Sequence, residues 1–147
     1  MKRLGLYALI LITFFSVSSS FFSPEKAFAQ TSPSTMDEYR AIGQGLFNTQ
    51  ITALNAKRAN PGTAPGIVGT TVEVVDALIR VVTEASSVFN TSLGSGTGAP
   101  GVQYKQALLS AKTYISTQQA QNPRILRQPY AKNLITVFTK QLEDTAF

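Results

Sequence analysis

Two pairs of acidic residues are the parts of this sequence that could perform acid–base chemistry or bind a metal ion. Glu73 and Asp76 lie three residues apart, and Glu143 and Asp144 are adjacent. Neighbouring carboxylates can act as general acid and base, or can supply oxygen ligands to Ca²⁺. The first pair lies in the opening turns of a predicted helix, where the helix dipole favours negative charge. Neither stretch offers the six or more oxygen ligands that Ca²⁺ needs, so we expect a structural role for both pairs.

The residue types that the sequence lacks exclude most other catalytic chemistry. It contains no histidine, no cysteine and no tryptophan. Without histidine there is no imidazole base near neutral pH and no ordinary zinc, copper or histidine-ligated haem site. Without cysteine there is no thiolate nucleophile, disulfide or iron–sulfur cluster. We therefore predict a protein that is not an enzyme and that binds no cofactor or metal. A carboxylate-based hydrolase using Glu73 or Asp76 is the least favoured alternative.

Two short motifs match known patterns without the structural context that those patterns need. Residues 96–101 (GTGAPG) fit G-x-G-x-x-G, which binds dinucleotides when it follows a strand and an acidic residue comes about twenty positions later. Here a helix is predicted before the motif, and residue 121 is a glutamine. Asn90-Thr91-Ser92 fits the N-glycosylation pattern but lies where a buried helix gives way to a loop. We favour a flexible linker at the first motif and leave glycosylation of Asn90 as a minor alternative.

Positive charge is the remaining candidate feature. In an up-down-up-down bundle the connections after the first and third helices lie at the same end, so two basic clusters there would form one surface. Such a surface could dock an acidic protein partner or make weak contact with anionic lipid. Ordinary solvated helix ends are the alternative, because cations also suit helix C-termini. No aromatic platform accompanies the cations, so we expect no nucleic-acid binding. The candidate docking residues are Lys57, Arg58, Arg124, Arg127 and Lys132.

The first twenty-nine residues predict where the protein is sent. Lys2 and Arg3 precede an apolar run, and Ala27-Phe28-Ala29 supplies a small-x-small processing pattern. We predict an export signal cleaved after Ala29, then a flexible arm at residues 30–34 and one domain at residues 35–147. The alternative is a retained membrane anchor, because Leu4 to Phe22 is nineteen residues without a charge. Either case places the domain in the periplasm, in the thylakoid lumen or outside the cell.

Apolar residues recur at steps of three and four along the rest of the chain, which predicts helices. Four are expected, at about residues 35–59, 70–93, 102–121 and 129–147. Capping boxes at Thr35–Glu38 and Thr70–Glu73 would begin the first two. Gly94 would end the second, and Pro129 would begin the last after a one-turn connector at residues 124–128. With connections of roughly six to ten residues, an all-α antiparallel four-helix bundle is the default fold.

The second predicted helix has the clearest apolar stripe and is expected to form the core of the fold. Its stripe consists of Val72, Val75, Leu78, Ile79, Val82, Ala85, Phe89 and Leu93. The third helix would bury Tyr104, Leu108, Ala111, Ile115 and Gln118, and the fourth Tyr130, Leu134, Val137, Phe138 and Leu142. In the first helix, Gly43 and Gly45 would allow a kink or a closely packed neighbour.

These observations predict an exported, non-catalytic helical bundle that docks on, or helps to assemble, a membrane-associated complex. In architecture, size and its Ala-Phe-Ala processing site, the chain resembles the small extrinsic helical-bundle subunits on the lumenal face of cyanobacterial photosystem II. The resemblance implies a lumenal subunit of a photosynthetic complex; it covers class and size only, and it transfers no functional residue. A periplasmic carrier is the alternative, with an apolar ligand held in the space beside Gly43 and Gly45.

Overall fold

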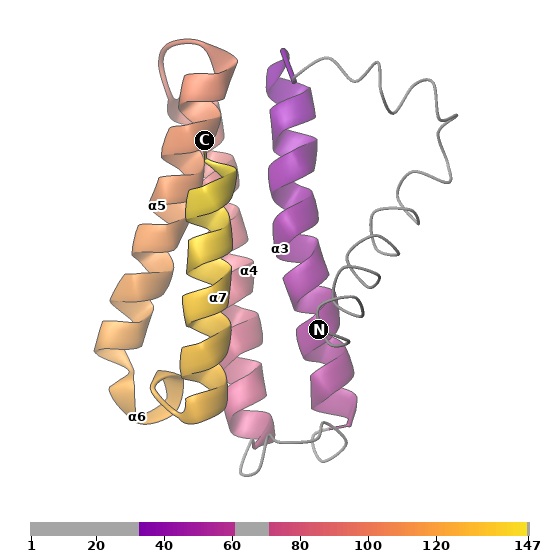
Figure 1. The fold of residues 1–147 in the computed structure, drawn as a ribbon, viewed down its shortest axis with the longest axis vertical. Helices are drawn as coiled ribbons and strands as arrows, with labels where there is room; N and C mark the ends of the chain where they lie inside the picture. The colour runs from indigo at the N-terminus through magenta and orange to yellow at the C-terminus, as the bar shows by residue number, and fades with distance from the viewer. Residues whose placement is uncertain (1–32, 61–70, 147) are drawn as a thin grey trace, which may run out of the picture. The chain divides into compact units, whose positions relative to one another are not determined.

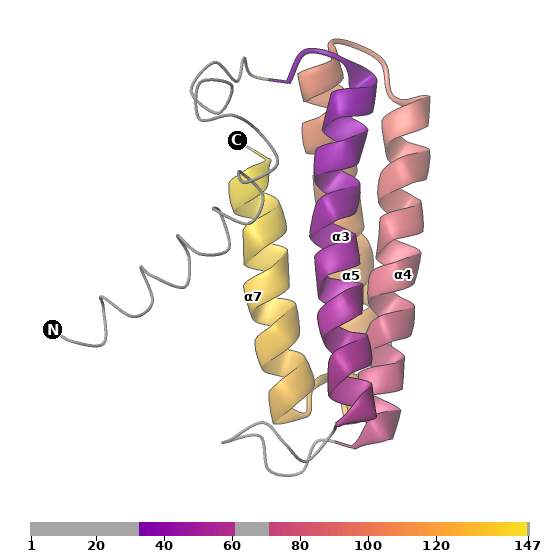
Figure 2. The same cartoon turned by 90° about the vertical axis from the view of Figure 1, so that its right-hand side faces the viewer.

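The computed structural model describes residues 33–60 and 71–146, which form a bundle of helices (Figure 1). The helices are α3 (Met36–Ala59), α4 (Val72–Ser95), α5 (Pro100–Gln121), α6 (Pro123–Leu126) and α7 (Pro129–Thr145). No strand occurs in this described part of the chain, so the all-α prediction is confirmed there. The four long helices run alternately up and down, which corresponds broadly to the expected bundle (Figures 1 and 2). The predicted export signal and most of the loop at residues 60–69 lie outside the described residues.

The start of α3 confirms the predicted capping box. Thr35 Oγ1 accepts a hydrogen bond from the backbone N–H of Glu38 at 3.3 Å, and the Glu38 carboxylate accepts the N–H of Thr35 at 3.0 Å. The same carboxylate oxygen accepts the N–H of Ser34 at 2.8 Å. The backbone N–H groups of Ser34 and Thr35 lower the pKa of Glu38, because they stabilise its ionised form. α3 ends at Ala59, as the Asn60-Pro61-Gly62 signal predicted.

The boundaries of α4 and α5 differ from the prediction by one to two residues. Thr71 caps α4, because its hydroxyl accepts the N–H of Val74; Thr70, the predicted cap, lies outside the described residues. α4 continues through Gly94 to Ser95, and Gly94 does not take the positive φ by which a glycine caps a helix. α5 begins at Pro100, where a residue without an N–H costs no helical hydrogen bond. The linker is therefore shorter than the predicted 94–101.

α4 is the centre of the bundle, as predicted. It packs extensively against both α3 and α5, and it also touches α6 and α7. Its buried side chains are Val74, Val75, Ala77, Leu78, Val81, Val82, Ala85, Phe89 and Leu93. The expected stripe was too narrow, because neighbours on several sides also cover Val74, Ala77 and Val81. The prediction that Val72 is buried was wrong, because its side chain is 41% exposed in the first turn of α4.

α5 and α7 show the same pattern of partial agreement. Tyr104, Leu108, Ala111 and Ile115 of α5 are buried as expected, and Gln118 is partly buried. In α7 the buried residues are Ala131, Ile135, Phe138 and Leu142, with Tyr130 and Leu134 partly buried. Val137 was predicted to be inside but is 66% exposed. The reason is that α7 packs chiefly against α5, which turns the helix so that Val137 does not reach the core.

Gly43 permits the close approach of α3 and α4. A Cβ atom at this position would overlap the ring of Phe89, whereas a Cβ on Gly45 would meet nothing within 4 Å. The Phe89 ring is held between Phe47, at 5.6 Å between centroids, and Tyr104, at 6.0 Å. The predicted close neighbour is therefore Phe89. Its ring fills the space beside Gly43 in which a carried ligand was expected.

Candidate functional site

The five cations predicted from the sequence come together at one end of the bundle. Lys57 and Arg58 lie in the last turn of α3, and Arg124 lies in α6. Arg127 follows α6 directly, and Lys132 lies in the first turn of α7. These segments all lie at the lower end of the view in Figure 1, with α6 and the end of α3 on opposite sides of α4. Four of the five side chains are exposed and Lys57 is partly buried. We call these five residues the basic end.

Two prolines and one buried leucine place the arginines of α6. Pro123 and Pro129 occupy the first positions of α6 and α7, where they set the backbone for a helix without losing a hydrogen bond. Leu126 is 1% exposed, and its carbonyl accepts a hydrogen bond from Gln119 Nε2 of α5 at 3.1 Å. Because Leu126 anchors the short helix inward, Arg124 and Arg127 are left on its exposed side.

Two cations of the basic end also join neighbouring helices. Lys57 Nζ lies 5.9 Å from the centroid of the Tyr130 ring, a cation–π contact between α3 and α7. Arg58 Nε donates to Asp76 Oδ1 of α4 at 2.5 Å. Both groups of this pair are about half exposed, so the pair contributes at most about 1 kcal/mol to stability. Burial raises the pKa of Tyr130, because it disfavours the charged phenolate.

Charge is distributed unevenly along the bundle. Towards the basic end there are six cations, the five above and Arg80, against the two carboxylates Glu73 and Asp76. Towards the opposite end four carboxylates (Asp37, Glu38, Glu143 and Asp144) are balanced by four cations (Arg40, Lys105, Lys140 and Lys112, which pairs with Glu143). The described part of the domain therefore carries its net positive charge at one end.

Three of the four candidate carboxylates, Asp76, Glu143 and Asp144, are paired with cations. Asp76 pairs with Arg58, and it lines an open groove of about 520 Å³ together with Glu73, Ala77, Arg80 and Ile125. Glu143 pairs with Lys112 at 3.1 Å, and Asp144 pairs with Lys140 at 3.2 Å. In residues 33–60 and 71–146, no group of three or more His, Cys, Asp or Glu side chains is placed to hold a metal ion.

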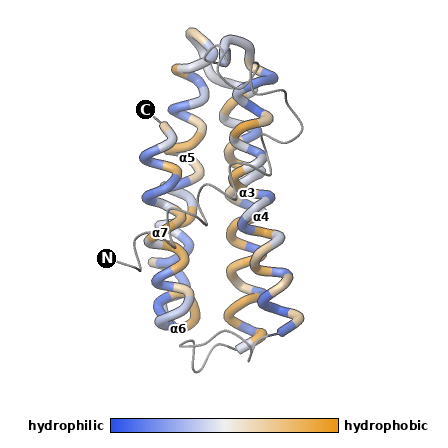
Figure 3. Tube along the Cα trace, turned by 45° about the vertical axis from the view of Figure 1, so that its right-hand side comes forward, coloured by the Kyte–Doolittle hydropathy of each residue, from blue (hydrophilic) through white to orange (hydrophobic). Residues whose placement is uncertain are grey.

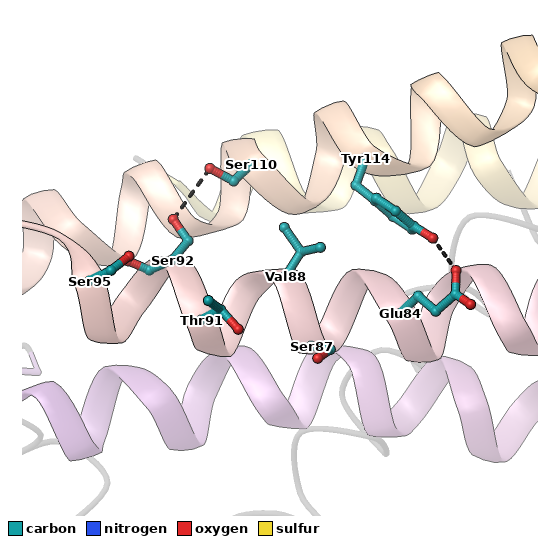
Figure 4. Close-up of a pocket in the computed structure, with 8 residues that line it drawn as sticks. All are labelled: Glu84, Ser87, Val88, Thr91, Ser92, Ser95, Ser110 and Tyr114. Atoms are coloured by element: carbon teal, nitrogen blue, oxygen red, sulfur yellow. Dashed lines mark hydrogen bonds between the residues drawn. The ribbon is translucent and has the colours of Figure 1, made fainter.

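A second, shallower groove of about 470 Å³ runs between α4 and α5 (Figure 4). At one end the Tyr114 hydroxyl donates to the Glu84 carboxylate; burial and this hydrogen bond raise the pKa of Tyr114 to about 12. At the other end Ser92 Oγ donates to Ser110 Oγ at 3.3 Å, and Ser110 donates to the Gln106 carbonyl. No carboxylate is bonded to either serine, so neither is activated as a nucleophile. Sequence reasoning missed the Glu84–Tyr114 pair, because thirty residues separate its members.

The glycine-rich motif forms a tight connection. Gln103 is buried, and its Nε2 donates to the Gly98 carbonyl at 2.7 Å. Gly98 has φ +108°, a conformation that side chains disfavour. Pro100 and Gly101 already belong to α5. The side chain of Gln103 thus ties Gly98 to the first turns of α5.

Asn90 of the glycosylation pattern lies within α4. Its Oδ1 accepts from Gln44 Nε2 of α3 at 3.1 Å, and its Nδ2 donates to the Ser86 carbonyl at 3.0 Å. The oxygen of the amide therefore joins α3 to α4, and its nitrogen is bonded within α4. A glycan on Nδ2 would replace one of its two hydrogens, at a side chain that is already partly buried.

No protein-family model, curated protein or solved structure matches the chain. None of the helices within residues 33–60 and 71–146 is long and apolar enough to cross a bilayer.

Proposed function

We propose that this protein is an exported, non-catalytic helical bundle that docks on a membrane-associated protein complex through its basic end. The observation that carries the proposal is the gathering of five cations from α3, α6 and α7 at one end. A lumenal extrinsic subunit of a photosynthetic complex is a role of this kind. Export and the membrane address rest on the sequence from Lys2 to Ala29.

The form of the basic end supports recognition of an acidic surface. Arg124, Arg127 and Lys132 are exposed, and they lie on a short segment that Leu126 anchors to the core. Anchored charges dock a partner with a smaller loss of conformational freedom than charges on a loose tail. Positive charge at one end also accelerates encounter with an acidic partner, to an extent that falls as salt is added.

Binding of the mature domain, residues 30–147, to native membranes tests this proposal. The variant is Arg124→Gln/Arg127→Gln/Lys132→Gln, which keeps Lys57 and Arg58 because they contact Tyr130 and Asp76. The matched control, Arg40→Gln/Lys105→Gln/Lys140→Gln, removes the same charge towards the opposite end. At about 0.5 kcal/mol for each charge, the first variant should bind about tenfold more weakly at low salt.

The control triple variant should bind within about twofold of the wild type. Membrane binding should also weaken as ionic strength rises, because the contacts are between exposed charges. Equal loss of binding in both triple variants would show that net charge alone matters. Binding that neither variant nor salt alters would contradict docking through the basic end.

A further inference from the structure

One side of the bundle, between α3 and α7, is apolar and is not covered by any described helix. We call it the α3/α7 face, and define it by Ile42, Leu46, Thr49, Ala53, Leu134, Val137 and Gln141. None of these side chains is charged. Ile42 is 42% exposed and Val137 is 66% exposed, and they are two of the four large hydrophobic side chains exposed in the described residues. Figure 3 is turned towards this side of the molecule.

Contacts along the two helices establish which residues share this face. Tyr130 of α7 meets Lys57 of α3, so residues seven and eleven positions after Tyr130 lie on the same side of α7. These are Val137 and Gln141. On α3, Gln44 points to Asn90 of α4 and Arg58 points to Asp76 of α4, which marks the side turned away from α7. Ile42, Leu46 and Ala53 lie on the other side of α3.

The backbones of α3 and α7 approach each other less closely than those of the other neighbouring helices. The two helices meet through long side chains: the Phe47 and Phe138 rings are 5.5 Å apart in an edge-to-face arrangement, and Lys57 covers Tyr130. Leu46 and Leu134 are only partly buried as a result. The α3/α7 face is therefore available to a further element packed from outside.

Both helices of this face carry opposite charges at their two ends. α3 begins with Asp37 and Glu38 and ends with Lys57 and Arg58. α7 is preceded by Arg127 and ends with Glu143 and Asp144. Arg40 and Lys140 pair with Asp37 and Asp144, so they reduce the negative charge at that end without cancelling it. At the other end Arg58 is turned to Asp76 of α4, which leaves Lys57 and Arg127 as the cations nearest the face. Two copies of the face placed in the same direction would bring like charges together. Two copies in opposite directions would bring each basic end against an acidic end.

We infer that the α3/α7 face is covered by a second copy of this chain, in an antiparallel dimer. The two-fold axis lies across the helices, so that α3 packs on the partner's α3 and α7 on the partner's α7. Val137 lies near the centre of this interface, Ile42 lies towards the end at which α7 finishes, and the charged helix ends lie at the rim. Because both copies use the same surface, this two-fold arrangement leaves no free face for a third copy.

The size of the face limits the strength of the dimer. α7 has 17 residues, so the face is about 26 Å long, and two adjacent helices make it about 20 Å wide. The dimer would therefore bury about 1,000 Å² in total, which is at the lower limit for a specific interface. We expect a dissociation constant in the micromolar range.

The decisive experiment compares Val137→Glu with Val102→Glu in residues 30–147, by sedimentation equilibrium from about 1 to 300 μM. The two valines are matched, because Val102 is 50% exposed on α5, away from the face. The wild type and Val102→Glu should dimerise, and Val137→Glu should be monomeric with an unchanged circular dichroism spectrum. A monomeric wild type would overturn the inference, and so would a dimer that Val137→Glu leaves intact or that both variants dissociate equally.

The direction of the two copies is tested by reversing charge at the helix ends. In the antiparallel dimer, Arg127→Glu and Asp144→Lys should each weaken dimerisation about fivefold at low salt, and the double variant should restore it to within about twofold. In a parallel dimer each single reversal would remove repulsion and strengthen dimerisation. Strengthening, or no effect of either reversal, would overturn the antiparallel arrangement.

Discussion

α4 is enclosed on nearly every side of its apolar stripe, whereas α7 is held mainly on one side. α4 contacts α3 and α5 along its length, and it buries nine side chains. α7 packs on α5, reaches α3 mainly through Phe138 and Tyr130, and buries four. Both helices have a clear apolar stripe in the sequence. An apolar stripe in the sequence therefore predicts that one face of a helix is buried. The number of helices packed around it determines how wide the buried face is.

The largest difference between the two helices should appear when a charge is introduced into each. Leu78 of α4 is fully buried, so Leu78→Lys should abolish cooperative thermal unfolding, because an unpaired ammonium group cannot be buried in the core. Val137→Lys on α7 should change the free energy of unfolding by no more than about 0.5 kcal/mol, since the site is exposed. Circular dichroism at low protein concentration measures both. A wild-type melting temperature for Leu78→Lys would contradict the central position of α4.

Removal of the Phe138 ring should produce the second largest difference between α4 and α7. Phe138→Ala should cost about 3 to 5 kcal/mol, because it leaves a cavity beside Phe47. Hydrogen exchange should then accelerate more in the amides of α7 than in those of α4, as α7 opens locally. Equal acceleration in both helices would indicate that α7 and α4 unfold as one unit.

A methyl group added to α3 tests the packing of α4 from the other side. Gly43→Ala should destabilise the protein by about 1 to 3 kcal/mol, because the Cβ overlaps Phe89, a ring that Phe47 and Tyr104 hold in place. Gly45→Ala is the matched control, and it should stabilise the protein by up to about 1 kcal/mol through helix propensity. Urea unfolding of both variants measures the difference. If Gly43→Ala stabilises the protein as Gly45→Ala does, the Phe89 ring shifts to accommodate the added methyl group.

The smallest expected effect concerns the helix N-termini. α3 begins with a capping box, whereas α7 has no side-chain cap. The pKa of Glu38 is lowered in the folded state, so its stabilising contribution is complete above its ordinary value of 4.5. That contribution is lost as pH falls through the lower folded-state pKa. Glu38→Gln should therefore reduce the slope of stability against pH in this acidic range. An unchanged slope would show that the capping carboxylate does not contribute.

The fold was predictable from the sequence wherever the signal is local. Thr35 and Glu38 form their box because both partners lie within one helical turn, and the α4 stripe is long enough to exclude a strand. The end of α4 was placed at Gly94 because glycine favours a C-cap. The helix nevertheless continues to Ser95, and the glycine with a positive φ is Gly98 in the connection that follows.

The predictions of burial fail where the position of another helix determines which side of a helix faces the core. Spacing places Val137 with Tyr130 and Leu134, and only the position of α5 turns it outward. For the candidate site, the topology predicted that Lys57, Arg58 and Arg124 share one end. It could not predict that Lys57 contacts Tyr130 and Arg58 contacts Asp76, because these pairs join different helices.

The uneven charge along the bundle affects how the molecule is oriented as it approaches a charged surface. α4 spans 24 residues, or about 36 Å, so positive charge at one end gives the domain a permanent electric dipole along its long axis. Near an acidic surface of the kind that the proposed function requires, the field would exert a torque on this dipole and turn the basic end towards that surface. In an antiparallel pair the two dipoles cancel, so only the monomer would be oriented in this way.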